Sequence, residues 1–131
     1  MVRGGWCVCR RRLVAARRWE PFEVLGEYTG YLVPPSRDGP YVCKLVQDEA
    51  DWEAVSVDAS KAGNELRFVN DYRGISEQPN VSFSSCFIDG LPRTLLVVTR
   101  PVAFGEEFLA DYGQSYWAAR GGGSKGGGAD E

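Results

Sequence analysis

The amino-acid sequence predicts a single, mostly β domain with little helix. Of its 131 residues, 44% are apolar and 12% aromatic, which is enough for one hydrophobic core but too little for two domains. Short segments with period-two alternation recur along the chain, separated by turns rich in glycine, proline and aspartate. There is no internal repeat and no apolar run near the length that spans a bilayer. We therefore expect a soluble domain that does not interact with membranes.

Three regions are expected along the chain. Residues 1–20 form a predicted N-terminal arm, because six of the 15 basic residues and no acid occur before Glu20. This arm has three interpretations: a disordered tail, a basic localisation patch, or an arginine-rich organellar presequence. Residues 21–119 are the predicted domain. Residues 120–131 are expected to be a flexible tail, since six of the eight residues that follow Arg120 are glycine.

The predicted strands follow one another in the body of the chain. Residues 22–33 alternate well enough for one strand, with Gly26 and Gly30 as bends. The loop 34–40 contains three prolines, and strands are expected at 41–46 and 52–57.

The second half of the body continues this pattern of short elements. One or two helical turns are expected at 62–68, and a polar loop follows at 71–78. Asp89-Gly90 predicts a hairpin turn between strands at 81–87 and 94–99. After a turn at 101–105, a last strand is expected at 107–112 and a short helix at 114–119.

Charge indicates what kind of partner the protein binds. Outside residues 1–19, nine basic residues stand against 18 acidic ones, a net charge of −9. Such a body favours a basic partner, for example a lysine-rich peptide, and argues against direct nucleic acid binding by the core. The alternative is that the acids only keep the surface soluble.

The absence of histidine excludes several enzyme classes. Histidine-based acid–base chemistry, Ser-His triads and most zinc hydrolases are ruled out. The four cysteines have no disulfide-framework spacing, and Cys7-Val8-Cys9 lacks partners elsewhere that complete a metal site. We therefore expect a reducing intracellular compartment and no bound metal.

Two segments indicate a functional site. In the stretch 63–71, Arg67, Asn70 and Asp71 alternate with large apolar residues, where unpaired polar atoms cost free energy. They must pair with each other, with the backbone or with a ligand. The segment 105–113 places Tyr112 beside Asp111 at the end of an apolar strand.

Three blocks of the sequence resemble the SET domain, the catalytic module of most protein-lysine methyltransferases. EYTG at 27–30 is similar to the family's early E-Y-x-G strand. DA at 58–59, GNELRFVN at 63–70 and PN at 79–80 together resemble its D-A…G-N-x-A-R-F-I-N-H-S-C-x-P-N segment. GEEFLADYG at 105–113 resembles G-E-E-L-x-x-D-Y-G, and the resemblance spans residues 24–117.

The resemblance implies a SET-like β-clip of short curved sheets, with a C-terminal pseudoknot that brings the two late segments together. It implies methyl transfer from S-adenosylmethionine to a lysine side chain of a protein or basic peptide, with a histone tail as one such substrate. This chemistry needs no histidine, because it depends on positioning the methyl donor in line with a neutral amine. The family's setting predicts a nuclear protein, with an organelle as the alternative.

The resemblance also assigns roles to seven residues. Tyr112 is implied as the catalytic tyrosine beside the methyl group, and Tyr28 as a residue of the lysine channel. The implied cofactor-binding residues are Arg67, Phe68, Asn70, Asp71 and Trp117.

The chain departs from the family in three places. The glycine strand G-x-G has no clear counterpart, and Gly4-Gly5-Trp6 is the nearest candidate. Asn70-Asp71-Tyr72-Arg73 replaces N-H-S-C, with a longer loop to Pro79, and Arg73 is placed to pair with Asp71. No cysteine-rich segment follows the domain. The alternative function is thus a catalytically inactive SET-like module that binds a basic peptide.

Overall fold

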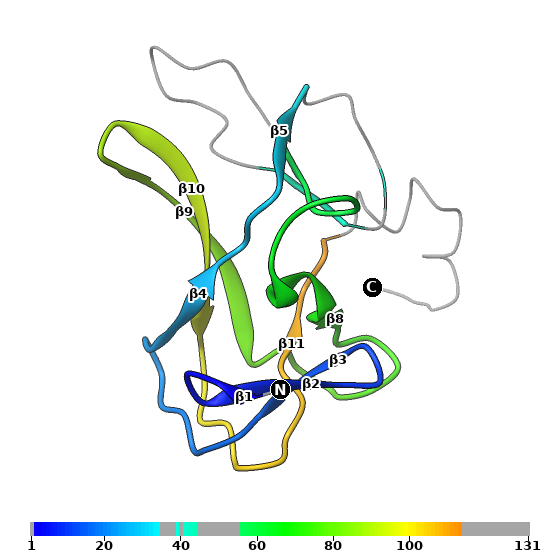
Figure 1. The fold of residues 1–131 in the computed structure, drawn as a ribbon. Helices are drawn as coiled ribbons and strands as arrows, with labels where there is room; N and C mark the ends of the chain where they lie inside the picture. The colour runs from blue at the N-terminus through cyan, green and yellow to red at the C-terminus, as the bar shows by residue number, and fades with distance from the viewer. Residues whose placement is uncertain (1, 35–38, 40, 45–55, 114–131) are drawn as a thin grey trace.

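A computed structural model describes residues 2–34, 39, 41–44 and 56–113 of the chain (Figure 1). Except for one short 3-10 helix, η1 (Glu65–Phe68), the regular elements in these ranges are all strands. They are β1 (Val2–Arg3), β2 (Trp6–Cys9), β3 (Arg12–Ala15), β4 (Val24–Glu27), β5 (Tyr31–Val33), β6 (Val42–Lys44), β7 (Ser56–Asp58), β8 (Asn70–Asp71), β9 (Val81–Ile88), β10 (Leu91–Val98) and β11 (Leu109–Ala110). The predicted mostly β fold with little helix is confirmed.

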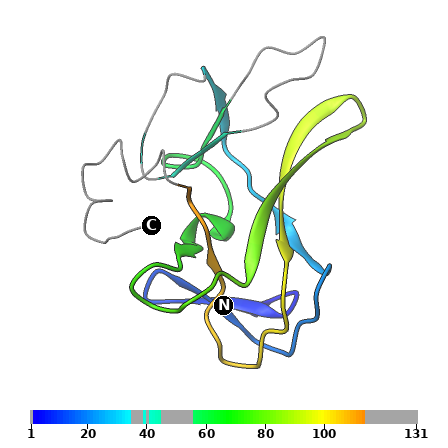
Figure 2. The same cartoon turned by 180° about the vertical axis from the view of Figure 1, so that it is seen from behind.

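The strands form four small sheets. Three of them are antiparallel, with the orders β1-β2-β3, β4-β10-β9 and β5-β7-β6, whereas β8 and β11 form a parallel pair. Both views of the ribbon place this pair between the β1-β2-β3 sheet and the β5-β7-β6 sheet, while the β9–β10 hairpin extends away from the rest (Figures 1 and 2). The two late segments of the sequence therefore meet in the middle of the domain.

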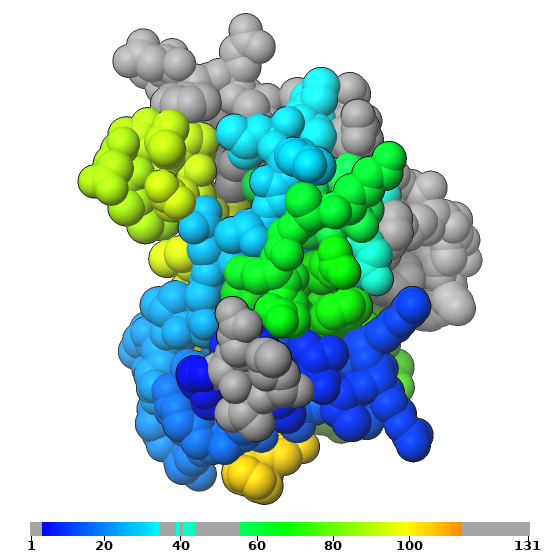
Figure 3. Space-filling view, viewed as in Figure 1, coloured from blue at the N-terminus to red at the C-terminus, as the bar shows by residue number. Residues whose placement is uncertain are grey.

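The prediction of an N-terminal arm outside the core is wrong for the residues that the structure describes. Trp6, Leu13 and Trp19 are buried in the main hydrophobic cluster, and Leu13 and Phe108 are joined by a backbone hydrogen bond. The space-filling view shows this segment packed against the body (Figure 3). The physical reason is a period-two pattern in β3, which turns Leu13 and Ala15 inward, while most of the arginines of this segment stay exposed.

The β2–β3 hairpin closes with two arginines in an unfavourable backbone conformation. Cys9 pairs with Arg12, so Arg10 and Arg11 form a two-residue turn, with φ of 54° and 61°. Such turns favour Asn-Gly because both central residues have positive φ. A side chain with a Cβ atom is strained there by about 1 kcal/mol.

We expect the double substitution Arg10→Asn/Arg11→Gly to stabilise the domain by about 1 kcal/mol, because it removes this strain. Urea unfolding of both proteins measures the difference. The matched control is Arg10→Gln/Arg11→Gln, which removes the same charge but keeps both Cβ atoms, and it should give no gain. An equal gain in both variants would assign the effect to charge repulsion instead.

The β9–β10 hairpin confirms the turn predicted at Asp89-Gly90. Ile88 pairs with Leu91 across it, and both central residues have positive φ. Alternate side chains of β10 are buried, so this strand has one face in the core although its last four residues are all apolar. β4 covers its other edge, with an irregularity between Leu96 and Val97.

The single strand predicted at 22–33 is instead two strands in different sheets. β4 pairs with β10 and β5 pairs with β7, and the chain changes sheet at residues 28–30. The bend depends on Gly30, because a Cβ atom there would lie 2.4 Å from the Asp58 carbonyl oxygen. The strand predicted at 41–46 is confirmed at 42–44, and residues 45–55 lie outside the described ranges.

The glycine and asparagine that begin the stretch 63–71 have a structural explanation. A Cβ atom on Gly63, whose φ is 145°, would lie 2.4 Å from the Thr29 carbonyl oxygen. Asn64 donates from Nδ2 to the Glu27 carbonyl at 2.8 Å and caps η1 by accepting from the Leu66 N–H. Gly63 and Asn64 thus attach η1 to the end of β4.

The loop between β8 and β9 encloses the C-terminal strand, as the expected pseudoknot requires. At its start, the Tyr72 N–H donates to the Ala110 carbonyl, and at its end the Asn80 N–H donates to the Leu109 carbonyl, each at 2.9 Å. The fully buried Asn80 side chain adds two hydrogen bonds to the same strand segment. β11 is therefore held from both ends of the loop.

Candidate functional site

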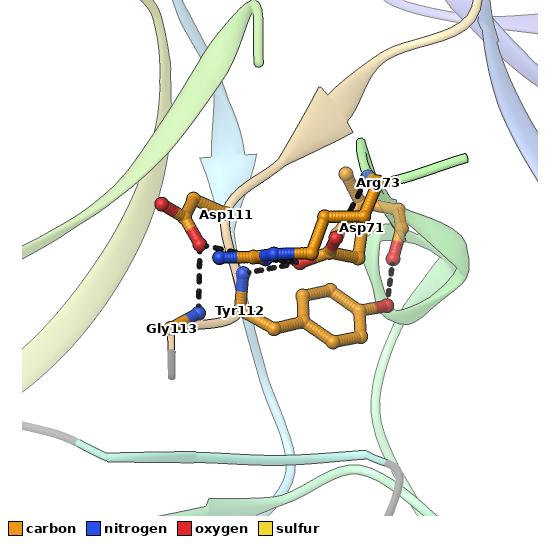
Figure 4. Close-up of polar contacts among 6 residues, drawn as sticks. Asp71, Arg73, Asp111, Tyr112 and Gly113 are labelled. Carbon is orange, nitrogen blue, oxygen red and sulfur yellow. Dashed lines mark hydrogen bonds and ion pairs between the residues drawn. The ribbon is translucent and has the colours of Figure 1, made fainter. Parts of the chain in front are cut away.

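The candidate site lies where β8 and β11 run side by side. Their parallel register pairs Asn70 with Leu109 and Asp71 with Ala110. Two residues further on, the Tyr112 N–H donates to Asp71 Oδ2 at 2.7 Å (Figure 4). Residues 37 to 43 positions apart in the sequence are thus neighbours in one small site.

Tyr112 is held at both ends. Its backbone N–H is bound by Asp71, and its hydroxyl donates to the Val69 carbonyl oxygen at 2.5 Å. The ring runs between these two contacts, below the Arg73 and Asp71 side chains in the view of Figure 4. This arrangement fixes the position of the phenol oxygen and directs its proton toward Val69.

Asp71 is a buried carboxylate with three donors. Oδ1 accepts the Arg73 N–H at 2.9 Å, while Oδ2 accepts Arg73 Nη1 and the Tyr112 N–H, both at 2.7 Å. The pairing of Arg73 with Asp71 expected from the sequence is confirmed. Arg73 Nη1 also lies 3.0 Å from Asp111 Oδ1, so the guanidinium joins two carboxylates.

Asn70 lies beside a pair of opposite charges. Its Nδ2 donates to Glu107 Oε2 at 2.8 Å, and Arg12 Nη1 lies 4.0 Å from Glu107 Oε1. The Glu107 side chain is 11% exposed and that of Arg12 is 50% exposed. β3 reaches this place through a bridge between Val14 and Glu107.

Arg67 and Phe68 lie on η1, next to β8. Arg67 Nη1 donates to the Ala59 carbonyl at 2.9 Å. Its guanidinium carbon lies 5.1 Å from the centre of the Phe68 ring and 5.8 Å from that of Tyr41. Arg67 therefore links η1 to the segment after β7 and packs against two aromatic rings.

Tyr28 is a buried phenol in the bend between β4 and β5. It is 5% exposed, donates from its hydroxyl to the Tyr41 carbonyl at 2.9 Å, and packs edge-on against Phe83. Burial raises its pKa far above the usual range, and the nearby Cys43 and Tyr112 raise it further. Tyr28 therefore stays protonated, and it is close enough to Tyr112 for the two groups to interact.

Sequence reasoning missed three components of this site: the Val69 carbonyl, Glu107 and Arg12. Glu107 is part of GEEFLADYG, but only the fold shows that it faces Asn70. Arg12 has no signal beyond its charge. In the candidate glycine segment, a Cβ atom on Gly5 would lie 2.6 Å from Arg17 Nε and 2.9 Å from the Trp19 ring, so this glycine allows close packing of those two side chains. Trp117 lies outside the described residues.

Other kinds of site receive no support from the described residues. Burial raises the pKa of the Cys43 thiol to about 12, which makes it a poor nucleophile at neutral pH. No three cysteine, aspartate or glutamate side chains in the described ranges come together as a metal ion would require. Among those same residues, no helix has the length and apolar character needed to cross a membrane.

Comparison with known proteins identifies the family. The SET domain model matches residues 10–113, and no curated protein sequence matches the chain. The crystal structure of ATXR5 in complex with mono-methylated histone H3.1 has a similar fold, with a TM-score of 0.65 and 21% sequence identity. The similarity covers 82% of this chain and 55% of that one, so the chain spans about half the length of its structural neighbour. The chain belongs to the SET domain family, a family of protein methyltransferases.

Proposed function

We propose that this protein is an S-adenosylmethionine-dependent protein-lysine methyltransferase. The observation that carries the proposal is the fixed position of Tyr112 at the junction of β8 and β11, with its hydroxyl on the Val69 carbonyl. Methyl transfer needs little acid–base chemistry, so a rigid polar group at the reacting centre is the main requirement. Tyr28, buried nearby and protonated, is the second residue of that centre.

The residues around Asn70 suit the methionine end of the cofactor. That end carries a carboxylate and an ammonium group, and Arg12 and Glu107 supply the two complementary charges beside the Asn70 amide.

Phe68 offers an aromatic face close to β8, and we assign the adenosyl group to Asn70, the backbone of Asp71, and Phe68. The Arg67 guanidinium lies over the Phe68 ring and stabilises this wall. Trp117 stays a predicted adenine contact.

The two tyrosines have separate tasks in the proposed reaction. When bound, S-adenosylmethionine supplies a methyl group on a positively charged sulfur. Because the Tyr112 proton points to Val69, the phenol oxygen presents its lone pairs to groups of positive character. The buried wall around Tyr28 and Phe83 excludes water, which lowers the pKa of an entering lysine and favours the neutral amine that attacks.

We propose a basic peptide, and specifically a histone tail, as the substrate. The chain as a whole has a net charge of −3, which favours lysine-rich segments as partners. The structural neighbour ATXR5 was crystallised with histone H3.1. A histone substrate places the protein in the nucleus, on chromatin.

The second candidate function is a SET-like module that binds a basic peptide without transferring a methyl group. It is favoured by the N-terminal segment, in which Arg10 and Arg11 form the turn before β3 and Arg12, the first residue of β3, lies 4.0 Å from Glu107. The long Arg12 side chain takes up space beside Glu107 that a glycine would leave open.

Calorimetric titration of the full chain with S-adenosylmethionine separates the two functions. The enzyme is expected to bind it with a dissociation constant of about 1 µM to 1 mM, the usual range for enzyme substrates. It should then transfer a radiolabelled methyl group to a histone mixture. Asn70→Ala should weaken cofactor binding by about tenfold, since it removes the amide beside Glu107. Peptide binding without any cofactor binding would overturn the enzyme and support the binding module.

A further inference from the structure

The most densely bonded part of the site is also the part that departs from the family segment. Asp71 and Arg73 replace the histidine and cysteine of N-H-S-C, and together with Asp111 they form a closed set of contacts around the Tyr112 backbone (Figure 4). We call these three residues the carboxylate clamp.

The clamp joins two segments that are distant in sequence. Arg73 is at the start of the loop after β8, whereas Asp111 directly precedes Tyr112 after β11. One guanidinium nitrogen, Nη1, lies 2.7 Å from Asp71 and 3.0 Å from Asp111. Asp111 in turn accepts the Gly113 N–H at 2.8 Å, so the backbone on both sides of Tyr112 is tied to the clamp.

The positive charge of Arg73 is needed to keep the Asp71 carboxylate in place. The Asp71 side chain is only 5% exposed, and a buried carboxylate without a counter-charge is strongly destabilising. Asp111 and Arg73 are more exposed, at 49% and 32%, so their pairing contributes less on its own. Without the guanidinium, the Asp71 carboxylate would turn toward water, and the Tyr112 N–H would lose its acceptor.

We propose that Asp71 and Arg73 are positioning residues for Tyr112. Asp71 holds the Tyr112 amide, Arg73 holds Asp71 and Asp111, and the phenol is thereby kept on the Val69 carbonyl. The proposal rests on the catalytic role proposed above for Tyr112. In this chain, an ion pair fixes the tyrosine from the segment where the family has histidine, serine and cysteine.

The test compares Arg73→Ala with Arg100→Ala in the full chain. Arg100 also holds the loop between β8 and β9, through the Gln78 and Pro79 carbonyls, but neither of its contacts is a carboxylate. Arg73→Ala is expected to speed amide hydrogen exchange of Tyr112 by about tenfold or more, because the hydrogen bond to Asp71 is lost. It should also lower kcat by about 10- to 100-fold, as expected for a small misplacement of a reacting group. The dissociation constant of S-adenosylmethionine should stay within about threefold, since Arg12, Asn70 and Glu107 are untouched.

Arg100→Ala should leave both the Tyr112 exchange rate and kcat close to those of the wild type. Arg73→Lys keeps the charge but loses the planar geometry, so it should restore part of the slow Tyr112 exchange and part of kcat. This variant also provides the test if the alanine variant does not fold. Unchanged Tyr112 exchange in Arg73→Ala would overturn the clamp, as would equal losses of kcat in the Arg73 and Arg100 variants. The exchange measurement does not require an active enzyme, so it tests the clamp by itself. The proposed function is tested separately, because it would be refuted if the wild-type chain did not bind S-adenosylmethionine.

Discussion

Replacing Tyr112 by phenylalanine is expected to lower kcat for a lysine peptide by about 100-fold or more. The substitution removes the hydroxyl that donates to the Val69 carbonyl and leaves the ring and the Tyr112 N–H in place. The loss corresponds to about 2.7 kcal/mol of transition-state stabilisation, a usual magnitude for one fixed polar group at a reacting centre. Affinity for S-adenosylmethionine should change by less than about threefold, because the charged groups around Asn70 are unaffected.

Steady-state kinetics and calorimetry on the same samples measure the two quantities. Tyr72→Phe is the matched control, since it removes a hydroxyl from a tyrosine near the site whose ring packs against Arg73, 5.0 Å away. This variant should keep kcat near the wild-type value. If Tyr112→Phe retained most of its turnover while Tyr72→Phe lost it, the catalytic role would belong to Tyr72 in the loop after β8 and not to Tyr112.

A contact can be predicted from the sequence when the two residues are close together in the chain, or when both belong to segments that resemble a known family. The turn at Asp89-Gly90 follows from residues that favour positive φ, and the pairing of Arg73 with Asp71 follows from their separation of two positions. The resemblance to the SET domain alone implies that the segments around Asn70 and Tyr112 meet in one site. The parallel pairing of β8 with β11 agrees with that expectation.

The wrong predictions occur where a strong local signal masks a weaker periodic one. The arginines at the N-terminus indicate an arm, whereas the alternation of buried Leu13 and Ala15 with less buried neighbours in β3 is the pattern that marks this segment as part of the core. The strand predicted at 22–33 is likewise too long, because its hydrophobic pattern continues through the bend at Gly30. The local hydrophobic pattern indicates which residues are buried, but it does not indicate which sheet a strand joins.

The contacts that define the site are out of reach of sequence patterns for a different reason. Asn70 and Glu107 are 37 positions apart, and their hydrogen bond exists only because the loop between β8 and β9 encloses β11. A crossing of this kind leaves no periodic signature in the sequence. The residue that holds the crossing together, Asn80, is therefore the most informative one to remove.

Replacing Asn80 by alanine is expected to destabilise the domain by about 3 kcal/mol or more. The side chain is fully buried, donates to the Glu107 carbonyl at 3.0 Å and accepts the Leu109 N–H at 2.7 Å. Alanine leaves both backbone groups buried and unpaired, at about 1–3 kcal/mol each, and adds a small cavity. For a domain whose total stability is about 5–15 kcal/mol, this loss should lower Tm by about 10 °C or more.

Thermal and urea unfolding of Asn80→Ala and of Gln78→Ala measure the effect. Gln78 lies on the same loop but is exposed, so its truncation should change stability by less than about 0.5 kcal/mol. Because β11 leads directly to Tyr112, the Asn80 variant should also show faster amide exchange at Leu109 and Tyr112 than in the β9–β10 hairpin. A loss below about 1 kcal/mol would mean that the backbone hydrogen bonds at both ends of the loop suffice to hold β11, and that the buried amide is needed only to fill space.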